Sequence, residues 1–501
     1  MSLLTSPAEF TILVIAWLAI LVPLSLRKGY AIFSVLLFAF VFFDFFSFRF
    51  PFRTEEFFTY TVTSGIMQTG HIPNLWESSW PAIFEVVSSL GESTGMSPLL
   101  SSEIFRILAP AVVAIFVTAL IGRVWPGFRP IVVIVSLLGS YGLSDIYPLT
   151  PAYFGIMTTF FFAFVILRWM DNPTQSNLIV AVVAILVAML THPFTMIYIS
   201  GITLAITLFS FVRYRVRNLP ILWLVILTTT SYDIFYVENF RTYLVSGLQQ
   251  ALGFLSNFEL GATDRQYIAS HIASQPPWSV QIVYFWVALS AMGVITAFVM
   301  FLRFHSPRWF LILGGLGVGL ILIQLLQSSQ SGIALAVLTY LSPIAIATLM
   351  AAVFRRARSP RVIRSLVLIL AAVILIGTVP SFLTYNSQVY TQSVLSSGVQ
   401  SVSYLRATGT SLTEVYGYYP GLVIAQAPFV FTSNYTPLGL QEYVNSFLKS
   451  RNTIFYTSIH KLYLGEEFLG VNSTFLSNLV YKVNGVDVVY GSSGVAVSYM
   501  P

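Results

Sequence analysis

The sequence predicts an all-α polytopic membrane protein of about 12 transmembrane helices, followed by an extracytoplasmic domain of mixed α/β structure. Hydrophobic residues make up 56% of the 501 residues and charged residues only 9%, and the mean hydropathy is +0.81. The apolar residues form separate continuous runs of about 18 to 24 residues, the length that crosses a bilayer as a helix. A β-barrel would instead show short alternating segments.

Separate apolar runs mark the expected crossings. They lie at residues 9–26, 30–48, 106–122, 130–143, 150–168, 176–191, 194–212, 219–236, 279–302, 309–326, 333–354 and 365–382. No Lys or Arg precedes the first run, and Arg27 and Lys28 follow it, which is the reverse of a cleavable signal peptide. We therefore expect a retained first helix with its N-terminus outside.

Basic residues are distributed unevenly over the loops between these runs. With the N-terminus outside, six short inner loops hold 15 of the 25 Lys and Arg residues, and Asp171 is the one acid among them. Positive charge in short loops marks the cytoplasmic side. The sequence thus predicts a multi-pass cell-membrane protein whose C-terminal tail lies outside. This asymmetry accounts for the basic composition, so no nucleic-acid partner is expected.

Three long segments remain on the predicted outer side. The transmembrane domain, residues 1–382, carries outer loops at 49–105 and 237–278, and residues 383–501 form the extracytoplasmic domain. The stretches "GLVIAQAPFVFTS" and "YKVNGVDVVYGSSGVAVSY" in this tail are β-prone, and Asn484-Gly485 is a hairpin signal. Its Tyr-rich, weakly charged surface would also suit a partner protein.

The first outer loop contains an acid pair. Thr54 precedes Glu55 and Glu56, and the pattern predicts a helix capped by Thr54 and ended by Gly70. A second piece rich in aromatic residues follows, and we expect its Trp76, Trp80 and Phe84 to lie in the lipid headgroup layer. The acid pair would then be held at the membrane surface.

Two stretches, "RTEEFFTYTVTSGIMQTGHIP" (residues 53–73) and "GSYGLSDIYPLTPAYF" (residues 139–154), carry a family resemblance. The chain resembles the polytopic GT-C glycosyltransferases, which take a sugar from a polyprenyl-phosphate donor. The resemblance covers the general layout of the whole chain. It implies that Glu55 occupies the position of the catalytic acid, where the family commonly has Asp, and that Asp145 is the acid of the second outer loop. One helix more than in the family precedes the first loop.

The resemblance implies that Glu55 removes a proton from an acceptor hydroxyl as that oxygen attacks the sugar. Asp145 would orient the acceptor or share a cation with Glu55, and oxygen ligands suit Mg²⁺ or Mn²⁺. The sequence leaves the need for a metal open. The alternative interpretation is that Glu55 and Glu56 complement a helix dipole and that Asp145 stabilises a turn.

Five further residues are candidate substrate-binding groups near the predicted outer surface: Glu56, His192, Arg241, Arg53 and His71. A histidine could donate to a phosphate or bind a metal, and an arginine could stabilise the leaving phosphate. Their alternative roles are a polar cap for the histidines and a membrane anchor or structural ion pair for the arginines.

The sequence leaves two functions open. One is a lipid-linked sugar transferase acting at the outer face, whose partners would be membrane lipid and a polyprenyl-phosphate sugar. The other is a noncatalytic membrane subunit that docks an envelope or respiratory-complex partner through its outer domain. A secondary transporter is less compatible, because acids within the expected crossings are few.

Overall fold

A computed structural model describes residues 7–26, 54–72, 80–125, 128–141, 149–212, 219–236, 245, 249, 277–304, 308–326, 340–357 and 359–392, together with five short strands between 415 and 500. The chain divides into two compact units. The first comprises residues 1–47, 74–87 and 103–384, and the second comprises residues 48–73, 88–102 and 385–501.

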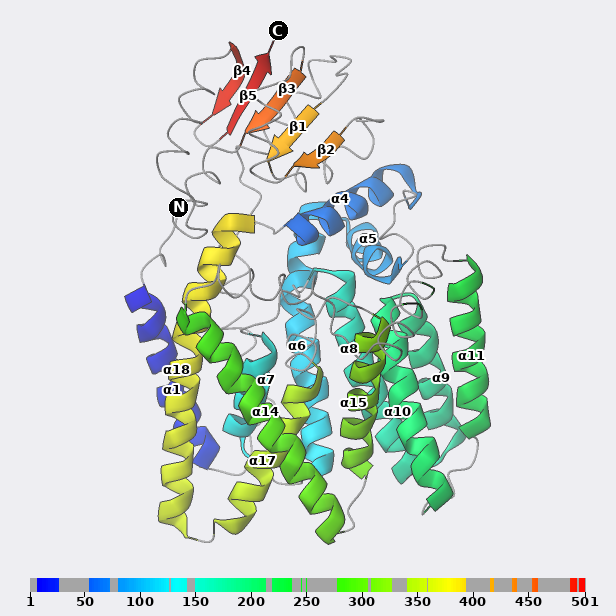
Figure 1. The fold of residues 1–501 in the computed structure, drawn as a ribbon, viewed down its shortest axis with the longest axis vertical. Coiled ribbons are helices and arrows are strands. Elements are labelled where there is room, and N and C mark those ends of the chain that lie inside the picture. Colours follow the sequence, from blue (N-terminus) through cyan, green and yellow to red (C-terminus); the bar gives the residue numbers. More distant parts are fainter. Residues whose placement is uncertain are drawn as a thin grey trace. The chain divides into compact units, whose positions relative to one another are not determined.

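Long helices build the first unit, where they run side by side as one bundle (Figure 1). They are α1 (Pro7–Leu26), α7 (Pro130–Tyr141), α8 (Pro151–Asp171), α9 (Gln175–Met189), α10 (Pro193–Val212), α11 (Leu219–Tyr236), α14 (Pro277–Phe304), α15 (Arg308–Leu326), α17 (Ser342–Arg356), and parts of α5 (Ala82–Thr94), α6 (Pro98–Val124) and α18 (Pro360–Gln392). The helix pairs α10 and α15, α14 and α17, and α8 and α9 pack together.

Helices lie at eleven of the expected crossings, and the remaining one, 30–48, falls outside the described residues. The prediction for α6 was wrong at its start, because this helix begins at Pro98 instead of residue 106. Within the described residues, three helices are long and apolar enough to span a membrane, at Pro98–Arg123, Pro151–Asp171 and Phe285–Leu302. The protein is thus a helical membrane protein, and the full number of crossings stays a prediction.

Large apolar side chains also cover the outside of the bundle. Leu224, Ile295, Ile321 and Ile376 are each more than 60% exposed although they lie within apolar helices. Soluble proteins rarely expose so much apolar surface. These side chains are suited to contact lipid.

Glycines allow α10 and α15 to approach each other backbone to backbone. A Cβ atom on Gly315 would lie 2.7 Å from the amide nitrogen of Ile202, and one on Gly201 would lie 2.8 Å from that of Gly319. No side chain fits between these backbones. The two helices therefore form a closely packed pair within the bundle.

The end of the bundle that the sequence predicts to lie inside is held together by two arginines. Arg129 donates to the carbonyl oxygens of Ser25 (2.7 Å) and Leu26 (3.0 Å), the last residues of α1, and its guanidinium lies 5.8 Å from the centroid of the Phe354 ring. These carbonyls have no partner within their own helix, so Arg129 caps it. Three segments predicted on one side of the membrane thus meet at one end.

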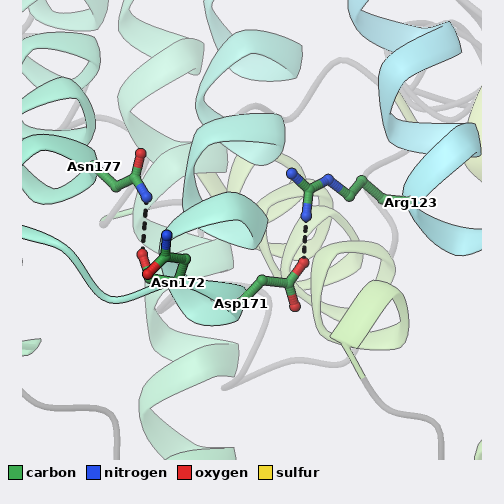
Figure 2. A network of polar contacts seen from close by, with 4 residues as sticks. All are labelled: Arg123, Asp171, Asn172 and Asn177. Carbon is green, nitrogen blue, oxygen red and sulfur yellow. Dashed lines mark hydrogen bonds and ion pairs between the residues drawn. The ribbon is translucent and has the colours of Figure 1, made fainter.

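Arg123, at the end of α6, pairs with Asp171, at the end of α8, over 2.6 Å (Figure 2). Asp171 is the acid that the sequence places alone among inner basic residues. Beside it, the Asn177 side chain donates to the Asn172 carbonyl oxygen over 2.8 Å and closes the turn from α8 into α9 (Figure 2).

Replacing Arg123 by Ala is expected to lower the free energy of unfolding by less than about 1 kcal/mol, because both partners of this ion pair are partly exposed. Arg129→Ala should cost more, since it removes the donor to the buried Ser25 carbonyl at the end of α1. Thermal unfolding of both variants in the same detergent measures the difference. Equal losses of stability would contradict this ranking.

The second unit contains a five-stranded sheet, made of β1 (Val415–Tyr418), β2 (Tyr435–Leu438), β3 (Thr453–Thr457), β4 (Asp487–Ser492) and β5 (Val495–Met500). Its strand order is β2-β1-β3-β5-β4. β1 is parallel to β2 and β3, whereas β5 is antiparallel to β3 and β4. Parallel neighbours cannot be joined by a tight hairpin and need crossover connections.

The last two strands form a hairpin within one of the β-prone stretches. Ser492 pairs with Val495, so residues 493 and 494 connect the strands. The turn predicted at Asn484-Gly485 therefore does not connect this hairpin, because the pair precedes both strands; it lies outside the described residues, as does "GLVIAQAPFVFTS". The extracytoplasmic position of the tail stays a prediction.

Candidate functional site

Segments predicted to lie outside come together at the other end of the first unit. The backbone N–H of Ala82, at the start of α5, donates to the Leu190 carbonyl oxygen, just beyond α9, over 3.0 Å. A Cβ atom on Gly155 of α8 would lie 3.1 Å from the Cβ of His192. The first outer loop, the start of α8 and the turn between α9 and α10 therefore share one end, which we call the His192 end.

His192 is the N-terminal cap of α10. Its Nδ1 accepts a hydrogen bond from the backbone N–H of Phe194 over 3.3 Å, and its carbonyl oxygen accepts from the N–H of Thr195 over 3.0 Å. Pro193, the first residue of the helix, has no N–H to satisfy. The sequence Thr-His-Pro thus supplies the local reason for both the turn and the ring position.

Aromatic rings surround His192. Its ring centroid lies 4.8 Å from that of Phe194, edge to face, and 6.2 Å from that of Trp80. Burial lowers the pKa of His192 from 6.5 to about 4 because the charged imidazolium would lose its hydration. A positive charge would also be unfavourable at the N-terminus of α10. The ring is therefore neutral at pH 7.

The expectation that the aromatic residues of the first loop lie in the headgroup layer was wrong for two of them. Trp80, just before α5, is 3% exposed and Phe84, within α5, is fully buried, so both side chains pack against protein. Trp80 packs against Ile234 of α11 as well as beside His192. Trp76 lies outside the described residues.

A buried cation lies near the same end. Arg106 of α6 is 2% exposed, and its guanidinium is 3.9 Å from the Glu103 carboxylate. Its neighbour Phe105 packs against Phe154 of α8, with ring centroids 5.9 Å apart, next to the Gly155 that contacts His192. Arg106 was the first residue of the crossing expected at 106–122, and in the structure it lies eight residues after the start of α6.

In the second unit, the acid pair lies in the first turn of α4 (Thr54–Thr69). Gly70 ends this helix as predicted: it has a φ of +69°, and its N–H donates to the Ile66 carbonyl oxygen over 2.7 Å. Glu56 is only 1% exposed. A carboxylate that merely complements a helix dipole needs no such burial.

Buried hydroxyl groups share the face of α4 that carries Glu56. Thr59 and Thr63, three and seven residues further on, are both fully buried. At the end of this face, a Cβ atom on Gly91 of α5 would lie 2.6 Å from Cε of Met67, so the missing side chain of Gly91 makes room for α4. Sequence analysis missed this polar stripe, although the spacing of Glu56, Thr59 and Thr63 could have revealed it.

The other predicted site residues lie in or next to α4 or outside the described residues. Glu55 lies in the first turn of α4, and its side chain is outside the described part of the structure. His71 is exposed just beyond α4, where its N–H donates to Oγ1 of Thr69 over 3.3 Å. Arg53, Asp145 and Arg241 lie outside the described residues. Whether the acids, a histidine and an arginine converge on one cavity therefore stays a prediction.

Metal binding was left open by the sequence. Within the described residues, no group of three or more His, Asp or Glu side chains could hold a metal ion, and the chain has no Cys. The two acids named as metal ligands, Glu55 and Asp145, have side chains outside that part of the structure.

No protein-family model and no curated protein matches the chain. Among solved structures, it is similar to ArnT from Cupriavidus metallidurans bound to undecaprenyl phosphate, with 14% identity, a TM-score of 0.48, and coverage of 93% of this chain and 97% of that chain. ArnT in the apo state gives 12% identity, a TM-score of 0.36 and 98% coverage of both chains. Similarities this weak establish neither a shared fold nor a shared function.

Proposed function

We propose that the protein is a membrane glycosyltransferase of the GT-C kind, transferring a sugar from a polyprenyl-phosphate donor to an acceptor at the outer face of the membrane. The proposal combines the helical membrane body with the acid pair at the start of α4. The observation that carries it is the burial of Glu56.

Burying a carboxylate costs free energy, and proteins retain such groups where they serve a site or a fixed conformation. At 1% exposure, Glu56 is not available to a substrate in this conformation. It instead anchors the first turn of α4, to which Glu55 also belongs. Holding a catalytic group on a firmly packed element is how a site keeps its geometry. Glu56 is thus a positioning residue, and Glu55 is the proposed catalytic acid.

In the proposed reaction, the Glu55 carboxylate accepts the proton of the acceptor hydroxyl. The acceptor oxygen forms a bond to the anomeric carbon from the face opposite the donor phosphate. The bond from that carbon to the phosphate oxygen breaks, and the electron pair leaves with polyprenyl phosphate. Inversion at the anomeric carbon follows from this direct displacement.

The leaving phosphate needs cations or N–H donors to stabilise its charge. Two such groups lie at or near the His192 end: the buried Arg106 guanidinium is a cation, and the partly buried His192 ring is an N–H donor. Arg53, Arg241 and His71 remain proposed contacts to donor or acceptor, and Asp145 is proposed to orient the acceptor.

Sugar transfer by the purified protein in lipid is the test. The assay uses a panel of radiolabelled polyprenyl-phosphate sugars, with and without Mg²⁺ or Mn²⁺. We expect transfer by the wild type and a loss of about 100-fold or more in Glu55→Gln, which keeps the size of the side chain but cannot accept a proton.

A folded wild-type protein that transfers no sugar from any donor would overturn the proposal. The noncatalytic subunit that docks an envelope or respiratory-complex partner would then be the better explanation. Equal transfer by the wild type and Glu55→Gln would keep the reaction class and remove Glu55 from the catalytic role.

A further inference from the structure

The hydrogen bond at Nδ1 determines what the other nitrogen of His192 can do. A neutral imidazole carries one proton, on one of its two nitrogens. Because Nδ1 accepts the Phe194 N–H, the proton of the neutral ring must be on Nε2. The hydrogen bond that one ring nitrogen makes sets the state of the other.

This tautomer narrows the roles of His192. An Nε2 that already carries a proton has no lone pair with which to bind a metal or to accept a proton from a substrate. Moving the proton to Nδ1 would set two N–H groups against each other at the start of α10. His192 is therefore a hydrogen-bond donor through Nε2, and neither a general base nor a metal ligand.

Packing holds the donor in one orientation. On one side, the absent side chain of Gly155 leaves room for the Cβ of His192. The rings of Trp80 and Phe194 lie beside the imidazole. Within the described part of the chain, the hydrogen bond of the ring is the one at Nδ1, so Nε2–H remains available to a ligand.

The surroundings favour an anionic oxygen as the ligand. The N-terminus of α10 carries a partial positive charge. Arg106 is buried on α6, next to the Phe105 that packs against Phe154 of α8, and its guanidinium lies 3.9 Å from the Glu103 carboxylate. Neither feature alone makes a site. Together with a fixed, neutral N–H donor, they match the chemistry of a phosphate oxygen.

We propose that His192 Nε2–H donates a hydrogen bond to a phosphate oxygen, with Trp80 and Gly155 as the residues that position its ring. The proposal rests on the transferase function, in which the phosphate belongs to the polyprenyl carrier. In this role His192 is one hydrogen-bond donor to that phosphate, and it neither abstracts a proton nor binds a metal.

Nitrogen NMR of the full-length protein in lipid nanodiscs tests the tautomer. The chain has five His residues, so selective ¹⁵N-histidine labelling gives few signals, and His192→Asn identifies the one that belongs to position 192. At pH 7 we expect the proton on Nε2. A proton on Nδ1, or a charged ring, would overturn the proposal.

Ligand titration in the same samples tests the phosphate. Short-chain polyprenyl phosphate should shift the Nε2–H signal, and the matching neutral polyprenol should not. Inorganic phosphate distinguishes the source: a shift at similar concentration indicates a site for phosphate itself, and its absence indicates one for the lipid phosphate. Equal shifts with polyprenol and polyprenyl phosphate, or none with either phosphate, would contradict a phosphate contact.

Two variants separate binding from folding. His192→Asn keeps an oxygen that can cap α10, but its shorter side chain cannot carry an N–H to the position of Nε2, so polyprenyl phosphate should bind about 10- to 100-fold more weakly at an unchanged thermal midpoint. His192→Gln carries the same amide on a side chain one methylene longer, which brings its N–H nearer the position of Nε2, and should recover part of that affinity. Wild-type affinity in His192→Asn would overturn the proposal. Because binding needs no turnover, it can fail or hold independently of sugar transfer.

Discussion

Alanine at Gly315 should leave little correctly folded protein, whereas alanine at Gly317, two residues further along α15, should be tolerated. The new methyl group at 315 would lie 2.7 Å from the amide nitrogen of Ile202 and 3.0 Å from the Gly201 carbonyl oxygen. These are backbone atoms, so α10 and α15 would have to separate as whole helices. Overpacking costs about 1–3 kcal/mol where side chains can adjust, and we expect at least that loss here.

The matched control at Gly317 uses the same substitution in the same helix. A Cβ atom there meets nothing within 4 Å, and Ala is the better helix former by about 1 kcal/mol in water. Size-exclusion profiles after heating in detergent compare the two variants with the wild type. Similar midpoints for Gly315→Ala and Gly317→Ala would show that α10 and α15 do not meet through these backbones.

Glu56→Ala is expected to loosen α4 and to reduce sugar transfer more than 10-fold. The substitution leaves a buried cavity beside Thr59 and Thr63 on the same helix face and removes the partner of the groups that contact Glu56. Removing one partner of a buried polar contact costs about 1–3 kcal/mol. Glu56→Gln keeps the volume and one acceptor oxygen and should lie between Ala and the wild type. Hydrogen–deuterium exchange over Thr54–Thr69 measures the loosening independently of activity.

Glu92→Gln, at an exposed position of α5 in the same unit, is the matched control and should leave both exchange and transfer unchanged. Faster exchange at α4 in Glu56→Gln and Glu92→Gln alike would mean that burial is not the cause. Full transfer by Glu56→Ala, with normal exchange, would remove Glu56 from the positioning role.

Apolar runs and special backbone residues were sufficient to predict the helices. Eleven of the expected segments are helical because a continuous apolar run has few alternatives to a helix in lipid. Gly70 ends α4 because a positive φ is favourable for glycine. The loop charges correctly grouped Arg123 with Asp171, and the end of α1 with the start of α7.

Apolar runs and loop charges do not predict which way a side chain points. Trp80 and Phe84 are typical of a helix in the headgroup layer, yet both are buried, and Trp80 packs against Ile234 of α11. The same composition is compatible with either position, and the free energy of burying an aromatic ring against protein decides between them.

By itself, the sequence determined that this is a helical membrane protein, where most of its helices lie, and which chain segments share an end. Only the tertiary structure decided that Glu56 is buried, that Gly315 cannot carry a side chain, and that His192 offers a proton at Nε2. The physical reason is the sequence distance over which each effect acts. Hydrophobic periodicity and turn preferences act between near neighbours in the chain, whereas burial and close backbone approach depend on residues brought together from distant segments.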